Sequence, residues 1–227
     1  EDAPVRGMKM VYLDGPRLDD RDLFGLIRRY PGLDALREGD DARLADFAAW
    51  LGEQPVVRTV AQVRCQHAVD GSRRVIEVEL GLRSPELPVV LASGARAWID
   101  AEGVLLPGIM PAPEGQPRPV LRGVEGVDRA RIDEALWLWS QVRRTLEPGL
   151  ITDIVLDAPL GLLDQRGIVL ATRSGSQLIW GLPGDTRFGL DRERKVRDLV
   201  HSIRCQGDLS RIATINVRYP KAFFTLR

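Results

Sequence analysis

The chain has 227 residues, of which 32 are Lys or Arg and 32 are Asp or Glu, so its formal net charge at pH 7 is zero. This balance argues against a nucleic-acid-binding protein with a wholly basic surface, because phosphate binding requires a concentrated excess of Lys and Arg. The length allows one large domain or two small ones, and the hydrophobic fraction of 44% is that of an ordinary globular protein.

No run approaches the roughly 20 apolar residues that cross a bilayer. The chain lacks an initiator Met and begins with the polar segment Glu1–Pro4. We therefore expect a piece or a processed product of a longer protein, from which a membrane anchor or signal has been removed.

The first part of the chain has the pattern of two helices and three strands. Carboxylates that can cap a helix precede two amphipathic segments, and apolar residues alternate with polar ones in the strands. Two helices on one face of a three-stranded sheet make a sufficient small α+β domain. The predicted elements are a strand (Met8–Leu13), a helix from Asp19 or Asp20 to Tyr30, a helix from Asp40 or Asp41 to Leu51, and two strands (Val57–Cys65 and Ile76–Leu82) joined by the turn Asp70–Ser72.

The stretch Arg83–Pro107 predicts a β-hairpin at the junction of two domains. Two apolar segments flank the polar link Asp100–Gly103, and its glycine can adopt the positive φ that such a turn needs. The chain after this stretch is longer and dominated by strands. We place the boundary after residue 85, which gives domains of residues 1–85 and 86–227.

The second part predicts an α+β arrangement with a larger, mostly antiparallel sheet and two helices. Trp139 lies on the apolar stripe of the first of these helices and is interpreted as a core residue, whereas Trp137 points elsewhere. The predicted elements are a Pro- and Gly-rich loop (Pro107–Pro119), a strand (Pro119–Leu121), a helix (Asp128–Leu146), strands (Leu150–Leu156, Ile168–Thr172 and Gln177–Gly181), a helix (Asp191–Ile203), a strand (Ile212–Tyr219) and an apolar tail (Ala222–Leu226).

Two Cys and two His residues leave three interpretations open. Cys65 and His67 are two apart, and His201 and Cys205 lie one helical turn apart, which allows a zinc site. A disulfide between the two Cys residues is the second possibility. We favour the third, free or buried thiols with no metal, because the Cys65 pair fits one face of an alternating strand.

The sequence gives no positive evidence for an enzyme. A catalytic site needs a base or a nucleophile with a partner, and the two His residues are both explained by their place on an element. No Gly-rich phosphate loop occurs, and we expect no cofactor.

The last strand favours a binding module instead. If it lies at a sheet edge, its unpaired N–H and C=O groups are a template for a partner strand. Arg218, Tyr219, Phe223 and Phe224 are of residue types that are enriched in interface centres. The alternative is that Tyr219 and one Phe complete the core.

Several segments, in their order along the chain, resemble the extracytoplasmic part of the FtsQ/DivIB family of bacterial cell-division proteins. The most specific of them is Ile215–Pro220, which is similar to the family's Val-Asp-Leu-Arg-Tyr-Pro strand. The first part of the chain looks like a POTRA domain. The other segments are Gln54–Val60, Leu82–Pro85, Ala97–Leu105, Pro119–Gly123, Leu170–Gly175, Ile179–Gly181 and Lys195–Leu199.

The resemblance implies a non-enzymatic scaffold of the division machinery, active in septum formation. The full protein would be a single-pass protein of the cell inner membrane, with its anchor before residue 1 and this fragment in the periplasm. Its partners would be FtsB/FtsL-like proteins, which add a β-strand near Arg218, Tyr219, Phe223 and Phe224, and other divisome membrane proteins through the POTRA domain. The alternatives are a POTRA-bearing chaperone or assembly module of envelope protein transport and a cell-envelope enzyme.

Overall fold

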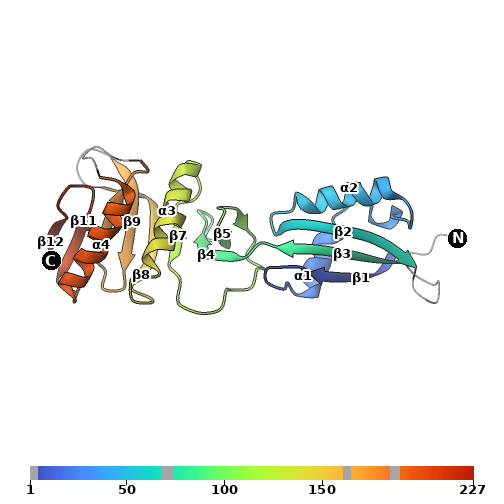
Figure 1. Ribbon diagram of the computed structural model, residues 1–227, viewed down its shortest axis with the longest axis horizontal. Coiled ribbons are helices and arrows are strands. Elements are labelled where there is room, and N and C mark those ends of the chain that lie inside the picture. The colour runs from blue at the N-terminus through green and yellow to red at the C-terminus, as the bar shows by residue number, and fades with distance from the viewer. Residues whose placement is uncertain (1–4, 68–73, 161–164, 185–189) are drawn as a thin grey trace. The chain divides into compact units, whose positions relative to one another are not determined.

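The computed structural model of the chain forms two compact units (Figure 1). The first unit comprises Glu1–Pro85 and Leu105–Pro113, and the second comprises Glu86–Val104 and Glu114–Arg227. The structure describes residues 5–67, 74–160, 165–184 and 190–227.

The first unit contains a three-stranded sheet and two α-helices, in the predicted order of strand, helix, helix, strand and strand. The central strand, β3, pairs in parallel with β1 and antiparallel with β2. The elements are β1 (Val5–Tyr12), α1 (Asp20–Ile27), the short 3₁₀-helix η1 (Leu33–Ala35), α2 (Asp41–Gly52), β2 (Val57–His67) and β3 (Arg74–Leu82).

Local hydrogen bonds and apolar alternation explain these elements. The Asp19 and Asp40 carboxylates cap α1 and α2 by accepting from backbone N–H groups of the first turn, at 2.8 and 3.2 Å. In β3, every second residue from Ile76 to Leu82 is buried, whereas Glu77 and Glu79 on the other face are half-buried. The helices therefore cover one face of this sheet, as predicted. The predicted turn Asp70–Ser72 lies outside the described residues.

The remaining strands form a nine-stranded sheet in the order β12-β11-β10-β9-β8-β7-β4-β5-β6, with two helices. The elements are β4 (Pro85–Val90), β5 (Arg96–Asp100), β6 (Leu105–Leu106), β7 (Val120–Arg122), α3 (Arg129–Val142), β8 (Ile151–Pro159), β9 (Arg166–Thr172), β10 (Gln177–Gly181), α4 (Arg192–Gln206), β11 (Ile212–Asn216) and β12 (Phe223–Leu226).

This larger sheet is mixed: it contains the antiparallel pairs that the sequence predicts and also parallel pairs that the sequence does not predict. β8 pairs in parallel with β7, and β11 pairs in parallel with β10, while β9 is antiparallel to both of its neighbours. The physical reason is that α3 lies between β7 and β8 in the chain, and α4 lies between β10 and β11. A helix returns the chain to the starting end of the sheet, so the next strand runs in the same direction.

The core of the second unit lies between these two helices and one face of the sheet (Figure 1). Trp139 packs in this core as predicted, and its indole N–H donates to Glu86 at 3.1 Å. The indole of the buried Trp180 donates to the Glu134 carboxylate at 2.9 Å, and the Lys195 ammonium lies 4.1 Å from the centre of the Trp180 ring. These polar side chains are satisfied within the fold, which explains how they tolerate burial.

One predicted turn forms as expected, and two predicted elements end earlier in the structure than the sequence suggests. The link Asp100–Gly103 does form a tight turn, in which the Asp100 carboxylate accepts from the N–H groups of Glu102 and Val104, and Gly103 has a φ of 73°. The helix that begins after Asp128 ends at Val142, four residues before the predicted end. The strand that begins at Ile212 ends at Asn216, so the predicted extension to Tyr219 is wrong.

One buried serine joins the turn after β9 to the chain that enters β11. The Ser176 hydroxyl lies 2.8 Å from the carbonyl oxygen of Leu209 and 2.7 Å from that of Ile212. Because β12 pairs only with β11 among the described strands, this contact helps to hold the outer end of the larger sheet in place.

We expect Ser176→Ala to lower the free energy of unfolding by about 1–3 kcal/mol, since the two carbonyl groups lose the one hydroxyl proton that they share. Urea unfolding followed by tryptophan fluorescence measures this loss. The matched change Ser93→Ala removes an exposed serine and should alter the value by less than about 0.5 kcal/mol. Equal effects of the two substitutions would contradict this role of Ser176.

Candidate partner-binding site

The strand β12 closes one end of the nine-stranded sheet. It pairs antiparallel with β11, with Phe223 opposite Asn216, Phe224 opposite Ile215 and Leu226 opposite Ile212. Its other side has no neighbouring strand among the described residues. Backbone N–H and C=O groups on that side are therefore free to pair with an added strand.

The side chains of β12 divide between the two faces of the sheet. Directly opposed residues of an antiparallel pair point to the same face. Phe224 and Leu226 thus share the face of Ile215 and Ile212, which are buried in the core beneath the helices. Phe223 and Thr225 point to the opposite face, and the Thr225 hydroxyl lies 2.7 Å from that of Thr214.

The exposed apolar side chains of β12 are Phe224 and Leu226 on one face and Phe223 on the other, and we call these three residues the β12 margin. The side chains of Phe223, Phe224 and Leu226 are 59%, 40% and 75% exposed, whereas Ile215 beside them is fully buried. Phe224 and Leu226 therefore continue the apolar core face out to the solvent. Exposed apolar groups that cluster in this way mark interaction surfaces more often than single exposed side chains do.

Arg218 lies in the bend between β11 and β12, and its side chain is used within the fold. Its guanidinium donates to Asn216 Oδ1 at 3.2 Å, to Gln165 Oε1 at 3.4 Å and to the Leu160 carbonyl oxygen at 3.0 Å. Leu160 belongs to a small apolar cluster with Val169 and Ile179. Arg218 thus ties the bend to the region that joins β8 and β9.

Tyr219 lies in the same bend and is half-buried. Its ring packs edge-to-face on Phe223, with 5.2 Å between the ring centres. The prediction that placed Arg218 and Tyr219 on the pairing strand is therefore wrong, because the bend carries them and β11 is enclosed by β10 and β12. Their position makes them supports of the β12 margin.

Leu226 is the residue of the β12 margin that the sequence interpretation missed. Its signal was the alternation within the short tail, where Phe224 and Leu226 are two apart and so share a face. The sequence alone could not show that this face continues the core, since that depends on the register with β11.

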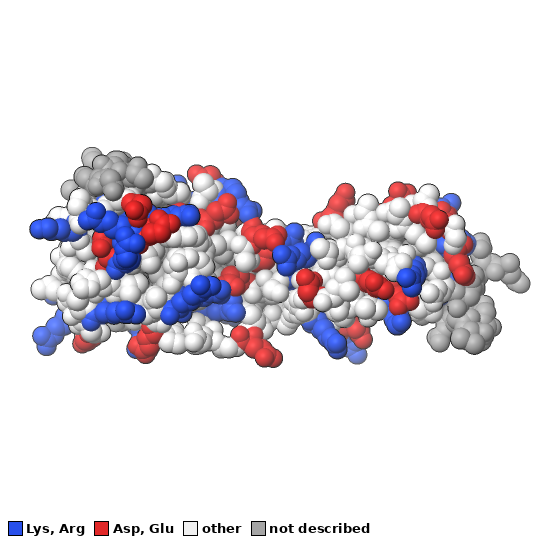
Figure 2. Space-filling model, viewed as in Figure 1, with Lys and Arg blue, Asp and Glu red and all other residues white. Residues whose placement is uncertain are grey.

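Charged groups near the ends of the neighbouring strands are paired. Hydrogen bonds from Arg166 and then Arg131 hold the pKa of Asp157 below its usual range, at the end of β8. Backbone and hydroxyl hydrogen bonds from Ser210 lower the pKa of Asp208, just before β11. Both carboxylates therefore stay ionised at neutral pH and serve the structure. Side chains of both signs are interspersed over each unit in Figure 2, which displays no single basic surface on the face it presents.

The His and Cys residues provide no metal cluster within the described part of the chain. Both thiols are free, with Cys65 buried in the first unit and Cys205 exposed in the second. Burial raises the pKa of the Cys65 thiol. The Cys205 sulfur lies 3.4 Å from His201 Nε2, one turn away on α4, and the side chain of His67 lies outside the described residues.

Comparison with known proteins gives no family assignment. No protein-family model matches the chain, and a search of curated proteins finds no match. Among the described residues, every helix is too short or too polar to cross a bilayer.

Arg218→Ala should lower the free energy of unfolding by about 1–3 kcal/mol, because Leu160 and Asn216 lose their charged hydrogen-bond donor. Denaturant titration of the purified chain tests this. Lys221→Ala, at an exposed position in the same bend, provides the control and should leave the stability unchanged. If Arg218→Ala were equally silent, Arg218 would not be a support of the β12 margin.

Proposed function

We propose that this chain is a non-enzymatic scaffold that captures a β-strand of a partner protein at β12. The observation that carries the proposal is the β12 margin, where an unpaired strand edge coincides with apolar side chains that extend the core. A partner strand would continue the backbone ladder, and its own apolar side chains would cover Phe224 and Leu226. Edge pairing gives affinity in such complexes, and the alternate side chains give specificity.

The exposed apolar side chains of β12 add to the affinity that backbone pairing supplies. Complete burial of one large apolar side chain contributes about 1.5–3 kcal/mol. Phe224 is 40% exposed and Leu226 is 75% exposed, so a partner gains part of this value at each. Tyr219 packs against Phe223 and reduces the freedom that Phe223 would lose on binding.

The proposed setting is the bacterial division machinery. The resemblance of Ile215–Pro220 to an FtsQ/DivIB segment supports it, and so does the order of strand, helix, helix, strand and strand in the first unit, which a POTRA domain shares. In this setting the partner strand belongs to an FtsB/FtsL-like protein. The fragment would lie in the periplasm, joined to a single anchor in the inner membrane, and its POTRA-like unit would contact further divisome membrane proteins.

Phe224→Glu and Leu226→Glu should each lower the affinity of the chain for a purified complex of FtsB- and FtsL-like proteins by at least about tenfold. The reason is that a carboxylate replaces an apolar contact beside the added strand. Because Leu226 is 75% exposed, the Leu226→Glu variant should retain the melting temperature of the parent chain. Titration calorimetry with the purified complex measures the affinity.

The matched control is Leu13→Glu, which places the same charge at another exposed apolar residue, in the first unit. It should leave the affinity unchanged. Unchanged affinity in both β12 variants would refute capture at β12, and failure of the parent chain to bind would refute the partner class.

A further inference from the structure

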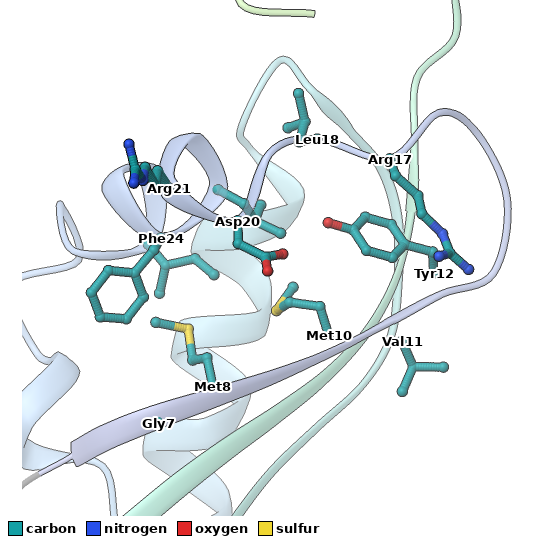
Figure 3. Close-up of a pocket in the computed structure, with 12 residues that line it drawn as sticks. Gly7, Met8, Met10, Val11, Tyr12, Arg17, Leu18, Asp20, Arg21 and Phe24 are labelled. Atoms are coloured by element: carbon teal, nitrogen blue, oxygen red, sulfur yellow. The ribbon is translucent and has the colours of Figure 1, made fainter. Parts of the chain in front are cut away.

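The first unit contains a groove of about 790 Å³ between α1 and β1 (Figure 3). Met8, Met10 and Tyr12 line it from the strand, and Leu23, Phe24 and Ile27 line it from the helix. The groove therefore has an apolar floor that two elements share.

The strand side of this groove is also a sheet edge. β1 is the outer strand in the order β1-β3-β2, and its far side has no neighbouring strand among the described residues. Met8, Met10 and Tyr12 pair with Ile76, Val78 and Leu80 of β3, all three of which are fully buried beneath the helices. The β1 residues point to that same face but are only half-buried, because nothing described lies beyond them.

The groove contains a polar group that the fold leaves unsatisfied. The hydroxyl oxygen of Tyr12 is buried and has no hydrogen-bond partner in the part of the chain that the structure describes. An orphaned buried hydroxyl costs about 1–3 kcal/mol, so an incoming partner gains by pairing with it. Burial and the charge of Asp20 raise the pKa of Tyr12, with an opposing effect from Arg17, so the hydroxyl stays neutral.

The charge that faces this hydroxyl is negative. In Figure 3 the Asp20 carboxylate and the Tyr12 hydroxyl point toward one another above Met10, whereas Arg21 points away from the groove. The Arg17 guanidinium lies against the face of the Tyr12 ring, 6.0 Å from its centre. This end of the groove therefore offers a cationic donor an acidic carboxylate and, beside it, a hydroxyl that lacks a partner among the described residues.

We infer that this groove binds an extended segment of a partner protein, which adds to β1 and presents a basic side chain between Asp20 and Tyr12. Every second residue of an added strand faces the groove. The side chains beside Met10 and Met8 are then apolar, and the recognised pattern is a Lys or Arg followed at alternate positions by two apolar residues. The direction of the added strand decides which end of the pattern comes first. This site belongs to the first unit and is separate from β12.

The test uses the purified chain and a capped, dye-labelled peptide of the length of β1. One face of the peptide carries a lysine and two leucines at alternate positions, and the other face carries threonines. Fluorescence anisotropy should give an affinity about tenfold higher than for the same peptide with glutamate in place of lysine. Equal affinities, or no binding at about 1 mM, would overturn the proposal.

Two substitutions identify the groups that recognise the lysine. Asp20→Asn should weaken binding of the lysine peptide about tenfold, while Asp22→Asn, in the same helical turn but outside the groove, should not. Tyr12→Phe should weaken binding by about threefold or more without lowering the melting temperature, because it deletes a hydroxyl that the free protein leaves unpaired. If the Asp20 and Asp22 variants behave alike, the basic side chain lies elsewhere and the assignment is wrong.

Peptide N-methylation tests the strand pairing. Methyl groups on alternate amides block one edge of a strand, so one of the two methylation registers should abolish binding and the other should leave it intact. Equal tolerance of both registers would exclude addition to β1. Phe224→Glu should leave this peptide's affinity unchanged, so this result is independent of capture at β12.

Discussion

Backbone hydrogen bonding at the ends of two open sheets is the constraint on which the surfaces of this protein depend. Each strand needs partners on both sides, and an open sheet leaves its outermost strands with partners on one side only. Among the described residues these strands are β1 and β2 in the smaller sheet and β6 and β12 in the larger one, and of these β1 and β12 carry apolar side chains on the face that continues a core. The two proposed docking sites follow from this shared circumstance.

The two edge strands, β1 and β12, differ in how they discriminate between partner segments. At β12 the exposed groups are apolar, so a partner is selected mainly by shape and by register along the ladder. At β1 the Tyr12 hydroxyl and the Asp20 carboxylate add a requirement for a donor of positive charge. Satisfying a specific buried polar group discriminates between ligands more sharply than an apolar contact does.

Features that depend on a few neighbouring residues were predictable from the sequence, and features that depend on register were not. Asp19 and Asp40 were among the predicted helix caps, and both are caps, because a cap is a contact within one turn. The parallel pairings of the larger sheet required knowledge of where each helix returns the chain. Arg218 was expected at the interface, yet it bonds to Leu160, 58 residues away in sequence, which no local pattern records.

The hydrogen bonds from Arg218 to Gln165 and Leu160, between β8 and β9, have a kinetic consequence. They hold the bend from which β12 emerges, so the receiving edge is already ordered before a partner arrives. The entropic penalty of association then falls on the partner segment. A partner segment that is stiff and extended in its free state should bind with a longer residence time than a flexible segment with the same side chains, although both would form identical contacts.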